Sequence, residues 1–456
     1  MVSPRPLLLE YRPRRRLAGG YRSALVTPPP PRRERTGWTV ALPLAAAVVA
    51  GLGVGSAPAP AALALLGVAT AAALLLRLEW AAAVVVVTAV FEDYLARVEP
   101  GVTKLVAAVL VVSWMVRRCH HRPQARHRSP VLAAATAFAA VLAAATLLHN
   151  NGDPGLAVVL RYAGFLAVLI VLSDAVRDGL APERLARWYV VACAAASLCG
   201  LAAFFLGADR RVGGPIGDPN DLAFFLLPAV ALGPAVRGSG RDRRLWDLAT
   251  VVVAMAIVGT LSRGALVGLA GMLVVAVLSG AVRLRVATGL VAAVAAAVLV
   301  GVAAVPQLVS VSLQQKSVIA DQNVSERLQL WGAAAQMTVE HPVLGLGPGA
   351  FALDHQEYTS SLPDDVNHPL DVAHNTWLEL SSELGVVGLA AFVAMLGLAY
   401  TEARRTWRGR GDPLAAAVCV SLVGTALAAT FVTEQYYLPF WLLAVLAVGV
   451  AERREP

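Results

Sequence analysis

The chain has 456 residues, of which 57% are hydrophobic and 15% charged, and its mean hydropathy is +0.65. Soluble domains carry about 25% charged residues, so this composition excludes an ordinary soluble domain. Many apolar runs approach the roughly 17–25 residues that a helix needs to cross a bilayer. Alternating segments of about 9–11 residues, which would indicate barrel strands, do not appear. The sequence therefore predicts an all-α polytopic membrane protein.

The net charge of +8 comes from 38 lysines and arginines against 30 aspartates and glutamates. These cations lie in clusters between apolar runs, which is the pattern that orients a membrane protein rather than one that binds nucleic acid. We therefore expect a lipid bilayer, and no nucleic acid, among the partners. The four cysteines, Cys119, Cys193, Cys199 and Cys419, show no metal-ligand spacing. We expect them to pack, and we expect neither a metal nor another cofactor.

Residues 1–37 contain nine arginines and a run of four prolines, so we expect a disordered basic tail that buries no core. Transmembrane helices are expected in 38–305 and again in 374–451. One large extracytoplasmic loop with short helices, 306–373, is expected between them, and residues 452–456 form a short tail. The spans, about 12–14 in number, are predicted near 38–56, 59–76, 78–91, 103–116, 131–148, 156–172, 188–206, 222–236, 247–261, 264–282, 286–305, 375–400, 414–432 and 437–451.

The distribution of cations predicts how the chain is oriented. If the N-terminus is cytoplasmic, the segments predicted inside contain thirty of the 38 lysines and arginines, and those outside contain seven. Cytoplasmic loops of membrane proteins carry such an excess. This predicts a multi-pass protein of the plasma (inner) membrane with both termini in the cytoplasm and loop 306–373 outside. The sequence shows no internal repeat, so a transporter built from two related halves gains no support.

Cations are rare in the segments predicted outside, so each of them is informative. Arg210 and Arg211 precede the turn-rich stretch 213–221, which contains Asn220. Arg263 lies between two predicted spans that have almost no loop between them. Arg161 lies inside a span, where a charge is costly unless it is paired or hydrated. We therefore expect a working site at the outer ends of the spans.

The outer loop contains a predicted helix that begins near Ser325, with that serine as its N-cap. Arg327 and Trp331 are four residues apart and share one side of this helix, so a cation and an indole could address one ligand. The apolar face expected from helical spacing consists of Leu328, Trp331, Ala335 and Val339. Alternate glycines follow at 345, 347 and 349, and they permit close approach of the backbone to a ligand or a span. Without a preceding parallel strand, they are no dinucleotide-binding fingerprint.

His374 follows this loop, and we predict that it lies in the first turn of the next span, with Asp371 as the N-cap. A helix N-terminus disfavours a protonated imidazole, so His374 is expected to be neutral and basic. Helical geometry places Asn375 and Glu383 toward a different flank from His374. We favour a structural role for Glu383, in which it pairs with a neighbouring span or loop.

Four pieces of sequence follow one another in this part of the chain: 217–223 (GDPNDLA), 262–265 (SRGA), 326–351 with the motifs ERLQLW and HPVLGLGPGAF, and 374–388 (HNTWLELSSELGVVG). In these residues the chain resembles the O-antigen ligase and O-antigen polymerase superfamily of lipid-linked polysaccharide enzymes. The resemblance covers roughly residues 200–400. It implies a membrane-embedded glycosyltransferase of the GT-C-like type. Such an enzyme transfers a glycan from a polyprenyl-diphosphate-linked oligosaccharide to a hydroxyl acceptor on the outer face of the membrane, without a nucleotide sugar.

The residue types agree with this chemistry. A diphosphate leaving group needs cations, and the planar fork of arginine makes bidentate contacts with phosphate. We therefore expect Arg263 and Arg327 to bind the diphosphate, with Arg210 and Arg211 as helpers, and His374 to be the general base for the acceptor hydroxyl. Supporting roles are expected for Asn220, Asn375, Trp331 and Glu383. The sequence also allows roles without chemistry for these residues: a lipid headgroup contact for Arg263, a solvated helix face for Arg327 and a helix cap for His374.

Two questions stay open in the sequence. A ligase passes a finished glycan to a different acceptor, whereas a polymerase extends another lipid-linked chain, and we slightly favour a polymerase or a general polysaccharide ligase. A protein-glycosylating relative is a further possibility. The alternative from another class is a secondary transporter or flippase of lipid-linked sugars, which would place charged residues deep within spans. Arg161 is the main residue that fits this alternative.

Overall fold

The computed structural model describes residues 74–75, 77–99, 101–120, 129–237, 241–304, 306–359 and 372–453. All of them belong to one compact unit, Thr70–Pro456. The predictions for the tail 1–37, for the first span and for nearly all of the second, and for Asp371 lie outside the described residues. So do residues 454–456.

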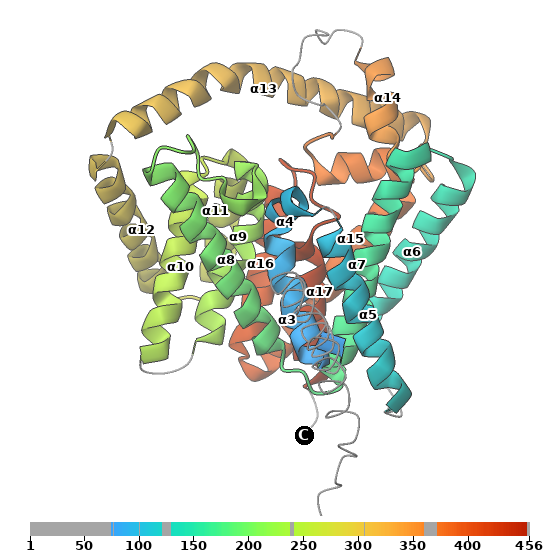
Figure 1. Cartoon of the computed structure of the whole chain (residues 1–456), viewed down its shortest axis with the longest axis horizontal. Helices are drawn as coiled ribbons and strands as arrows, with labels where there is room; N and C mark the ends of the chain where they lie inside the picture. The colour runs from blue at the N-terminus through green and yellow to red at the C-terminus, as the bar shows by residue number, and fades with distance from the viewer. Residues whose placement is uncertain are drawn as a thin grey trace, which may run out of the picture. The chain divides into compact units, whose positions relative to one another are not determined.

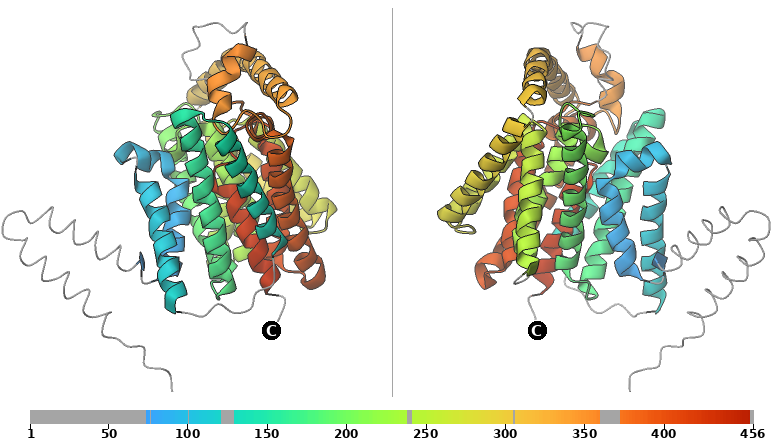
Figure 2. Two further views of the ribbon diagram at one scale, coloured as in Figure 1. Left: turned by 90° about the vertical axis from the view of Figure 1, so that its right-hand side faces the viewer. Right: turned by 60° about the vertical axis from the view of Figure 1, so that its left-hand side comes forward.

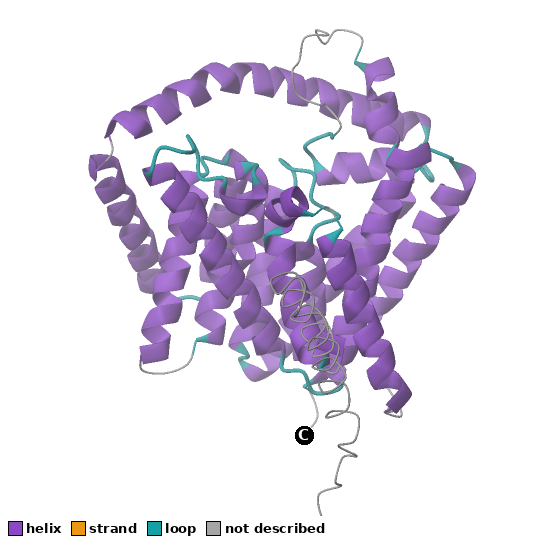
Figure 3. Cartoon of the chain, in the orientation of Figure 1, coloured by secondary structure: helices purple, strands orange, loops and turns teal. Residues whose placement is uncertain are grey.

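Every regular element among the described residues is helical (Figure 3). The helices are α3 (Leu78–Val90), α4 (Glu92–Val98), α5 (Val102–His120), α6 (Pro130–Leu148), α7 (Gly152–Arg177), α8 (Pro182–Phe205), α9 (Pro219–Val236), α10 (Arg241–Gly259), α11 (Arg263–Leu278), α12 (Leu284–Ala304), α13 (Pro306–Glu340), α14 (Ala350–Tyr358), α15 (Thr376–Arg410), α16 (Pro413–Ala428) and α17 (Leu438–Glu452), with a short 3-10 turn at Gly214–Ile216. Each span predicted from residue 78 onward overlaps one of these helices.

Five of the helices are long and apolar enough to cross a membrane, namely α6, α7, α8, α9 and α15. Shorter apolar helices accompany them, and these are α3, α11, α16, α17 and the segment Leu284–Val300 of α12. Together they support the prediction of an all-α polytopic membrane protein. Small residues permit close packing between these helices, as is typical inside membranes. A Cβ atom on Gly268 of α11 would lie 2.7 Å from the carbonyl oxygen of Gly424 of α16.

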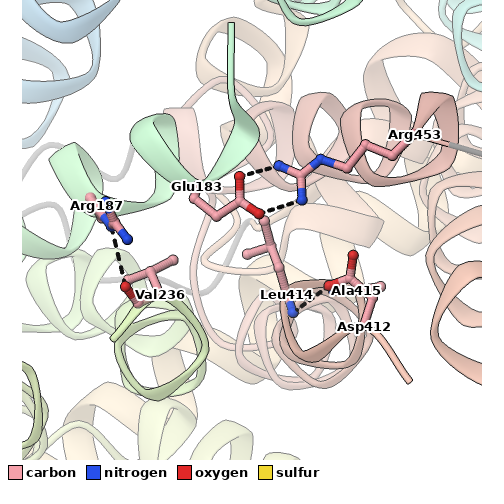
Figure 4. Close-up of polar contacts among 7 residues, drawn as sticks. All are labelled: Glu183, Arg187, Val236, Asp412, Leu414, Ala415 and Arg453. Atoms are coloured by element: carbon pink, nitrogen blue, oxygen red, sulfur yellow. Dashed lines mark hydrogen bonds and ion pairs between the residues drawn. The ribbon is translucent and has the colours of Figure 1, made fainter. Parts of the chain in front are cut away.

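Ion pairs align several helices at one end of the bundle. Arg453, just after α17, donates two hydrogen bonds to the carboxylate of Glu183 in the first turn of α8 (Figure 4). Nη2 of Arg177, the last residue of α7, lies 2.9 Å from Oε1 of Glu452. Arg410, the last residue of α15, donates to the carbonyl of Arg453. The end of α7, the start of α8 and the ends of α15 and α17 therefore lie at one level.

The aligned helices differ in length, and this difference determines where the polar loops lie. Helices α7 and α8 have 26 and 24 residues, whereas α16 and α17 have 16 and 15. At 1.5 Å per residue, the first pair extends about 36–39 Å and the second pair about 22–24 Å. The loop 429–437 between α16 and α17 therefore lies closer to the end with the aligned ion pairs than the far end of α8 does.

Helix α13 crosses over the end of the bundle that lies opposite the aligned ion pairs, and α14 lies beside it (Figures 1 and 2). The prediction of a short helix capped by Ser325 was wrong, because α13 runs without interruption from Pro306 and Ser325 is an exposed interior residue. Leu328 and Val339 of the predicted apolar face are 60% and 77% exposed, so this face is not the side that packs on the rest of the protein. Packing decides the buried side, where the contacting residues are Leu330, Ala334, Met337, Phe351 and Ala373.

The alternate glycines that follow α13 pair with a break in α15. Gly385 has a φ of 65° and interrupts the helix, and the carbonyls of Ser382 and Glu383 accept hydrogen bonds from the amides of Leu346 and Gly347 at 3.0 and 2.9 Å. A Cβ atom on Gly385 would lie 2.2 Å from the carbonyl oxygen of Val343. The glycines therefore serve close contact between two backbone segments, one of the two uses that the sequence left open.

Candidate functional site

His374 lies in the chain just before α15, and not in the first turn as predicted. Its φ of 51° is in the left-handed region, and Asn375 is the N-cap, whose Oδ1 accepts hydrogen bonds from the amides of Trp377 and Leu378. The reason is the next residue, Thr376, whose amide donates to the carbonyls of Ala429 and Val432 at 2.9 Å. These bonds tie the start of α15 to the α16–α17 loop and leave His374 outside the helix.

The α16–α17 loop supports the segment that carries His374 through hydrogen bonds. The Thr376 hydroxyl donates to the carbonyl of Val432 at 2.8 Å and accepts from the amide of Glu434 at 2.9 Å. Glu379, one turn into α15, is 2% exposed. Its carboxylate accepts hydrogen bonds from the Ala373 amide and from the side chains of Thr433, Gln435 and Tyr436. A buried carboxylate thus fixes the segment that carries His374.

Sequence reasoning did not single out this loop. The signal was present, because Glu434, Gln435, Tyr436 and Tyr437 form a polar run directly between two apolar spans. Such a run at the end of a short hairpin looks like an ordinary turn until the lengths of α16 and α17 are known.

Arg327 reaches this site from α13. Its Nη1 donates to the carbonyl of Phe431 at 3.2 Å, and the indole of Trp331, one turn later, lies 6.4 Å from the Phe431 ring. The guanidinium acts electrostatically on His374 and is itself repelled by Arg263. Arg327, His374 and Arg263 are therefore neighbours, although they come from three separate segments of the chain.

Arg263 is held at the site by a strained turn. It is the first residue of α11, the hydroxyl of Ser262 caps this helix, and Leu261 has a φ of 55°. A non-glycine residue in the left-handed region costs free energy, and this cost is typical of residues that position a functional group. Gly264 follows, and a Cβ atom there would lie 2.6 Å from the Cβ of Phe431. The exposed Arg263 side chain therefore starts beside the same loop that binds Arg327.

The two remaining predicted arginines differ in their surroundings. Arg211 is half-buried, its Nε donates to the carbonyl of Thr260 at 2.8 Å, and its Nη2 donates to Oδ1 of Asn220 at 3.2 Å. It also interacts electrostatically with Arg327. Arg210 is exposed, and it forms no hydrogen bond or ion pair within the part of the chain that the structure describes. The structure brings Arg211 into the cluster and leaves Arg210 outside it.

Burial and neighbouring charges shift the pKa values of His374, Arg327 and Arg211. Burial and the positive charge of Arg327 lower the pKa of His374 to about 4, against a smaller opposing effect of Asp218. Burial also lowers the pKa of Arg327 and of Arg211, while Asp218 counteracts it in both cases. His374 is therefore neutral at physiological pH, as the sequence predicts, but burial and a neighbouring cation are the cause. Because burial disfavours the positive charges of these arginines, an anion that binds beside them is stabilised.

Glu383 contacts a different part of the chain from this charge cluster. Its carboxylate is 3% exposed and interacts with the backbone N–H groups of Gly349 and Phe351 at the start of α14. One oxygen, Oε2, has no partner of good hydrogen-bond geometry among the described residues. Glu383 therefore joins the broken part of α15 to the glycine-containing segment, which is a contact with a loop.

Comparison with known proteins places the matched part of the chain in a family. The family model described as O-antigen ligase matches residues 248–393, a segment that contains Arg263, Arg327 and His374. The resemblance to the O-antigen ligase and polymerase superfamily is therefore confirmed. No curated protein matches the chain. Arg211, Asn220 and the α16–α17 loop lie outside the matched segment, so their presence at the site is a finding of the structure.

Proposed function

Since residues 248–393 match the O-antigen ligase family, we propose that the chain is a membrane enzyme of that type and that it transfers a glycan from a polyprenyl-diphosphate donor to a hydroxyl acceptor. The arginine cluster of Arg211, Arg263 and Arg327 binds the diphosphate, and His374 accepts the proton of the acceptor hydroxyl. One observation carries this proposal. Arg327 is at once a neighbour of the other cations and the charge that acts on His374.

The arginines suit the leaving group. The bond between the anomeric carbon and the phosphate oxygen breaks, and its electron pair leaves with the diphosphate, so negative charge grows at the position that the guanidinium groups surround. Charge-assisted contacts to phosphate are strong, and they strengthen further where water is excluded. Asn220 holds Arg211 through a hydrogen bond of 3.2 Å and thereby orients the guanidinium.

His374 completes the transfer on the acceptor side. The acceptor oxygen forms a bond to the anomeric carbon, and its proton passes to the neutral imidazole. An imidazole with a pKa of about 4 is a weak base in the free protein. A bound diphosphate would offset the positive charge of Arg327, and the loss of this repulsion would raise the proton affinity of His374. The base therefore becomes effective only when the donor is present.

Orientation and supporting residues follow from the same arrangement. The excess of cations in the segments predicted inside favours an extracytoplasmic site at the plasma membrane, with both termini cytoplasmic. Asn375 caps α15 and so fixes the residue that follows His374. Trp331 packs toward Phe431 and supports the loop that Arg327 contacts.

The test is incubation of the purified protein in lipid vesicles with a polyprenyl-diphosphate oligosaccharide, followed by sizing of the glycan products. A ladder of longer products indicates a polymerase, and one discrete shift onto an added acceptor indicates a ligase. Entry of labelled lipid-linked sugar into the vesicles without any transfer would replace the proposal by a transporter.

A further inference from the structure

The α16–α17 loop lies about as far from the charged end of the bundle as Arg161 of α7 does. Leu438, the first residue of α17, is about 21 Å along that helix from the charged end that Arg453 and Glu183 mark, at 1.5 Å per residue. Arg161 is 16 residues before the end of α7, or about 24 Å from the same level. Taking this charged end as one edge of the hydrocarbon core, which is about 30 Å thick, both positions fall within the core. Irregular backbone at this depth occurs only where protein buries it or water reaches it.

Arg161 contacts this loop, and its charged side chain is partly exposed. Its guanidinium carbon lies 5.6 Å from the ring centre of Tyr436 and 5.4 Å from that of Tyr437. Nη2 lies 3.9 Å from the carboxylate of Glu92 on α4, and the two side chains are 45% and 26% exposed. A partly exposed ion pair at this depth faces water or a polar ligand rather than lipid. The surface formed by Arg161, Tyr437 and Glu92 is therefore open to a polar molecule.

A buried carboxyl group, that of Glu434, lies next to this surface. Glu434 is 0% exposed, and its carboxyl group shares a hydrogen bond with the carboxyl group of Asp221. Within the described part of the chain, neither of its oxygens accepts a hydrogen bond from an amide, hydroxyl or guanidinium group. Its neighbours are the carboxyl group of Asp221 at the start of α9, Arg161 and the Tyr437 hydroxyl. Two carboxyl groups that share one proton still leave buried oxygens without a donor, and such oxygens indicate a missing water or ligand. The carboxyl group therefore points to a second site that lies beside the arginine cluster.

We propose that Arg161, Tyr437 and Glu434 form a binding site for one sugar ring of the glycan substrate, next to the diphosphate site. The proposal rests on the proposed function and deepens it. An aromatic ring offers an apolar face to a sugar, while a carboxyl group and a guanidinium bind neighbouring hydroxyls as acceptor and donor. A second diphosphate fits poorly, because the carboxyl groups of Glu92 and Glu434 interact with Arg161 and would repel it.

The site is connected to the reacting groups through Asp221, which interacts electrostatically with both Glu434 and Arg327. A sugar held here therefore lies next to a diphosphate held by Arg327. It is either the first sugar of the donor or the sugar of the acceptor that carries the attacking hydroxyl. All three residues of the site lie outside the matched segment 248–393, so the family match does not assign them.

The experiment compares Glu434→Gln and Tyr437→Leu with the wild-type protein in three measurements. These are the affinity for sugar-free polyprenyl diphosphate, the affinity for polyprenyl diphosphate that carries the oligosaccharide, and the KM for the acceptor. Loss of one partner of a buried hydrogen bond predicts about a tenfold change. A selective loss of affinity for the sugar-bearing donor assigns the donor's first sugar, and a rise only in the acceptor KM assigns the acceptor.

The matched control is Glu183→Gln, the same chemical change at the opposite end of the bundle, which is expected to leave all three values unchanged. Affinity for sugar-free polyprenyl diphosphate also reports whether each variant is folded. The proposal is overturned if that affinity falls in parallel with the others, or if none of the three values changes in Tyr437→Leu, which removes the aromatic ring. If the wild-type protein transfers no glycan, the proposed function fails, and the two affinity measurements still decide whether a sugar site exists.

Discussion

Arg327 on α13 and His374 before α15 are electrostatic neighbours, although 46 residues of sequence separate them. The guanidinium disfavours a proton on the imidazole, and the carbonyl of Phe431, 3.2 Å from Nη1 of Arg327, anchors that guanidinium to the α16–α17 loop. The loop also binds Thr376, two residues after His374. One loop thus positions both the cation and the base.

The pH dependence of transfer follows from this relationship. His374 must be neutral to accept a proton, and its pKa of about 4 means that it becomes protonated only in strong acid. We expect kcat/KM for the donor, which reports the free enzyme, to stay level as the pH falls until about pH 4–5. In Arg327→Gln the repulsive charge is gone, so the pKa of His374 rises and activity is lost at a higher pH. An unchanged acid limb in this variant would contradict the pairing of the two residues.

Arg210 and Arg211 give a matched pair of neighbouring arginines. Arg211 is bound to Thr260 and Asn220 beside the cluster, whereas Arg210 is exposed. We expect Arg211→Gln to lower kcat/KM for the donor by about 10²–10³-fold, the usual cost of removing one preorganised donor to a developing anion. Arg210→Gln should lower it by less than about threefold, as is usual for an exposed charge. Equal losses in the two variants would show that the exposed arginine also reaches the diphosphate.

The break in α15 predicts a difference between two glycines of the same helix. Gly385 has a φ of 65°, and a Cβ atom there would meet the Val343 carbonyl, whereas a Cβ on Gly397 would have no neighbour within 4 Å. We expect Gly385→Ala to lower the free energy of unfolding by at least about 1–3 kcal/mol. Gly397→Ala should be neutral or slightly stabilising. Thermal unfolding in detergent measures both, and a Gly385→Ala protein as stable as the wild type would argue against the break.

Thiol labelling in intact cells tests the orientation of the chain. Cys119 is exposed near the end of α5, on the side predicted to be cytoplasmic, and Val339 on α13 is 77% exposed on the opposite side. A maleimide that cannot cross the membrane should leave Cys119 unlabelled in the wild-type protein. It should label Val339→Cys when Cys119 and Cys199 are replaced by serine. The reverse pattern would place α13 in the cytoplasm and would remove the outward-facing site.

The sequence predicted the helices well, because long apolar runs specify membrane helices with little help from tertiary contacts. It also indicated Arg211, Arg263 and Arg327, since cations outside the predicted cytoplasmic segments are few, and it indicated His374 from its position at the start of a span. It could not show that Ser325 is internal to α13, because a serine before a charged residue has the same pattern as a true N-cap.

The other features that the sequence did not predict depend on contacts between distant segments. His374 is outside α15 because Thr376 bonds to the α16–α17 loop, and no local pattern encodes this. Arg161 and Glu434 come together only because α16 and α17 are shorter than α7, so that their loop reaches the level of Arg161. Sequence reasoning identified Arg161 as unusual but had no partner to give it.

The most direct measurement is transfer by purified His374→Ala protein, compared with the wild type, from a polyprenyl-diphosphate oligosaccharide. Loss of a general base lowers the rate by about 10²–10⁴-fold. We expect a loss of this size, with binding of sugar-free polyprenyl diphosphate retained because the arginines remain. Transfer at the wild-type rate by the variant would contradict the central role of His374.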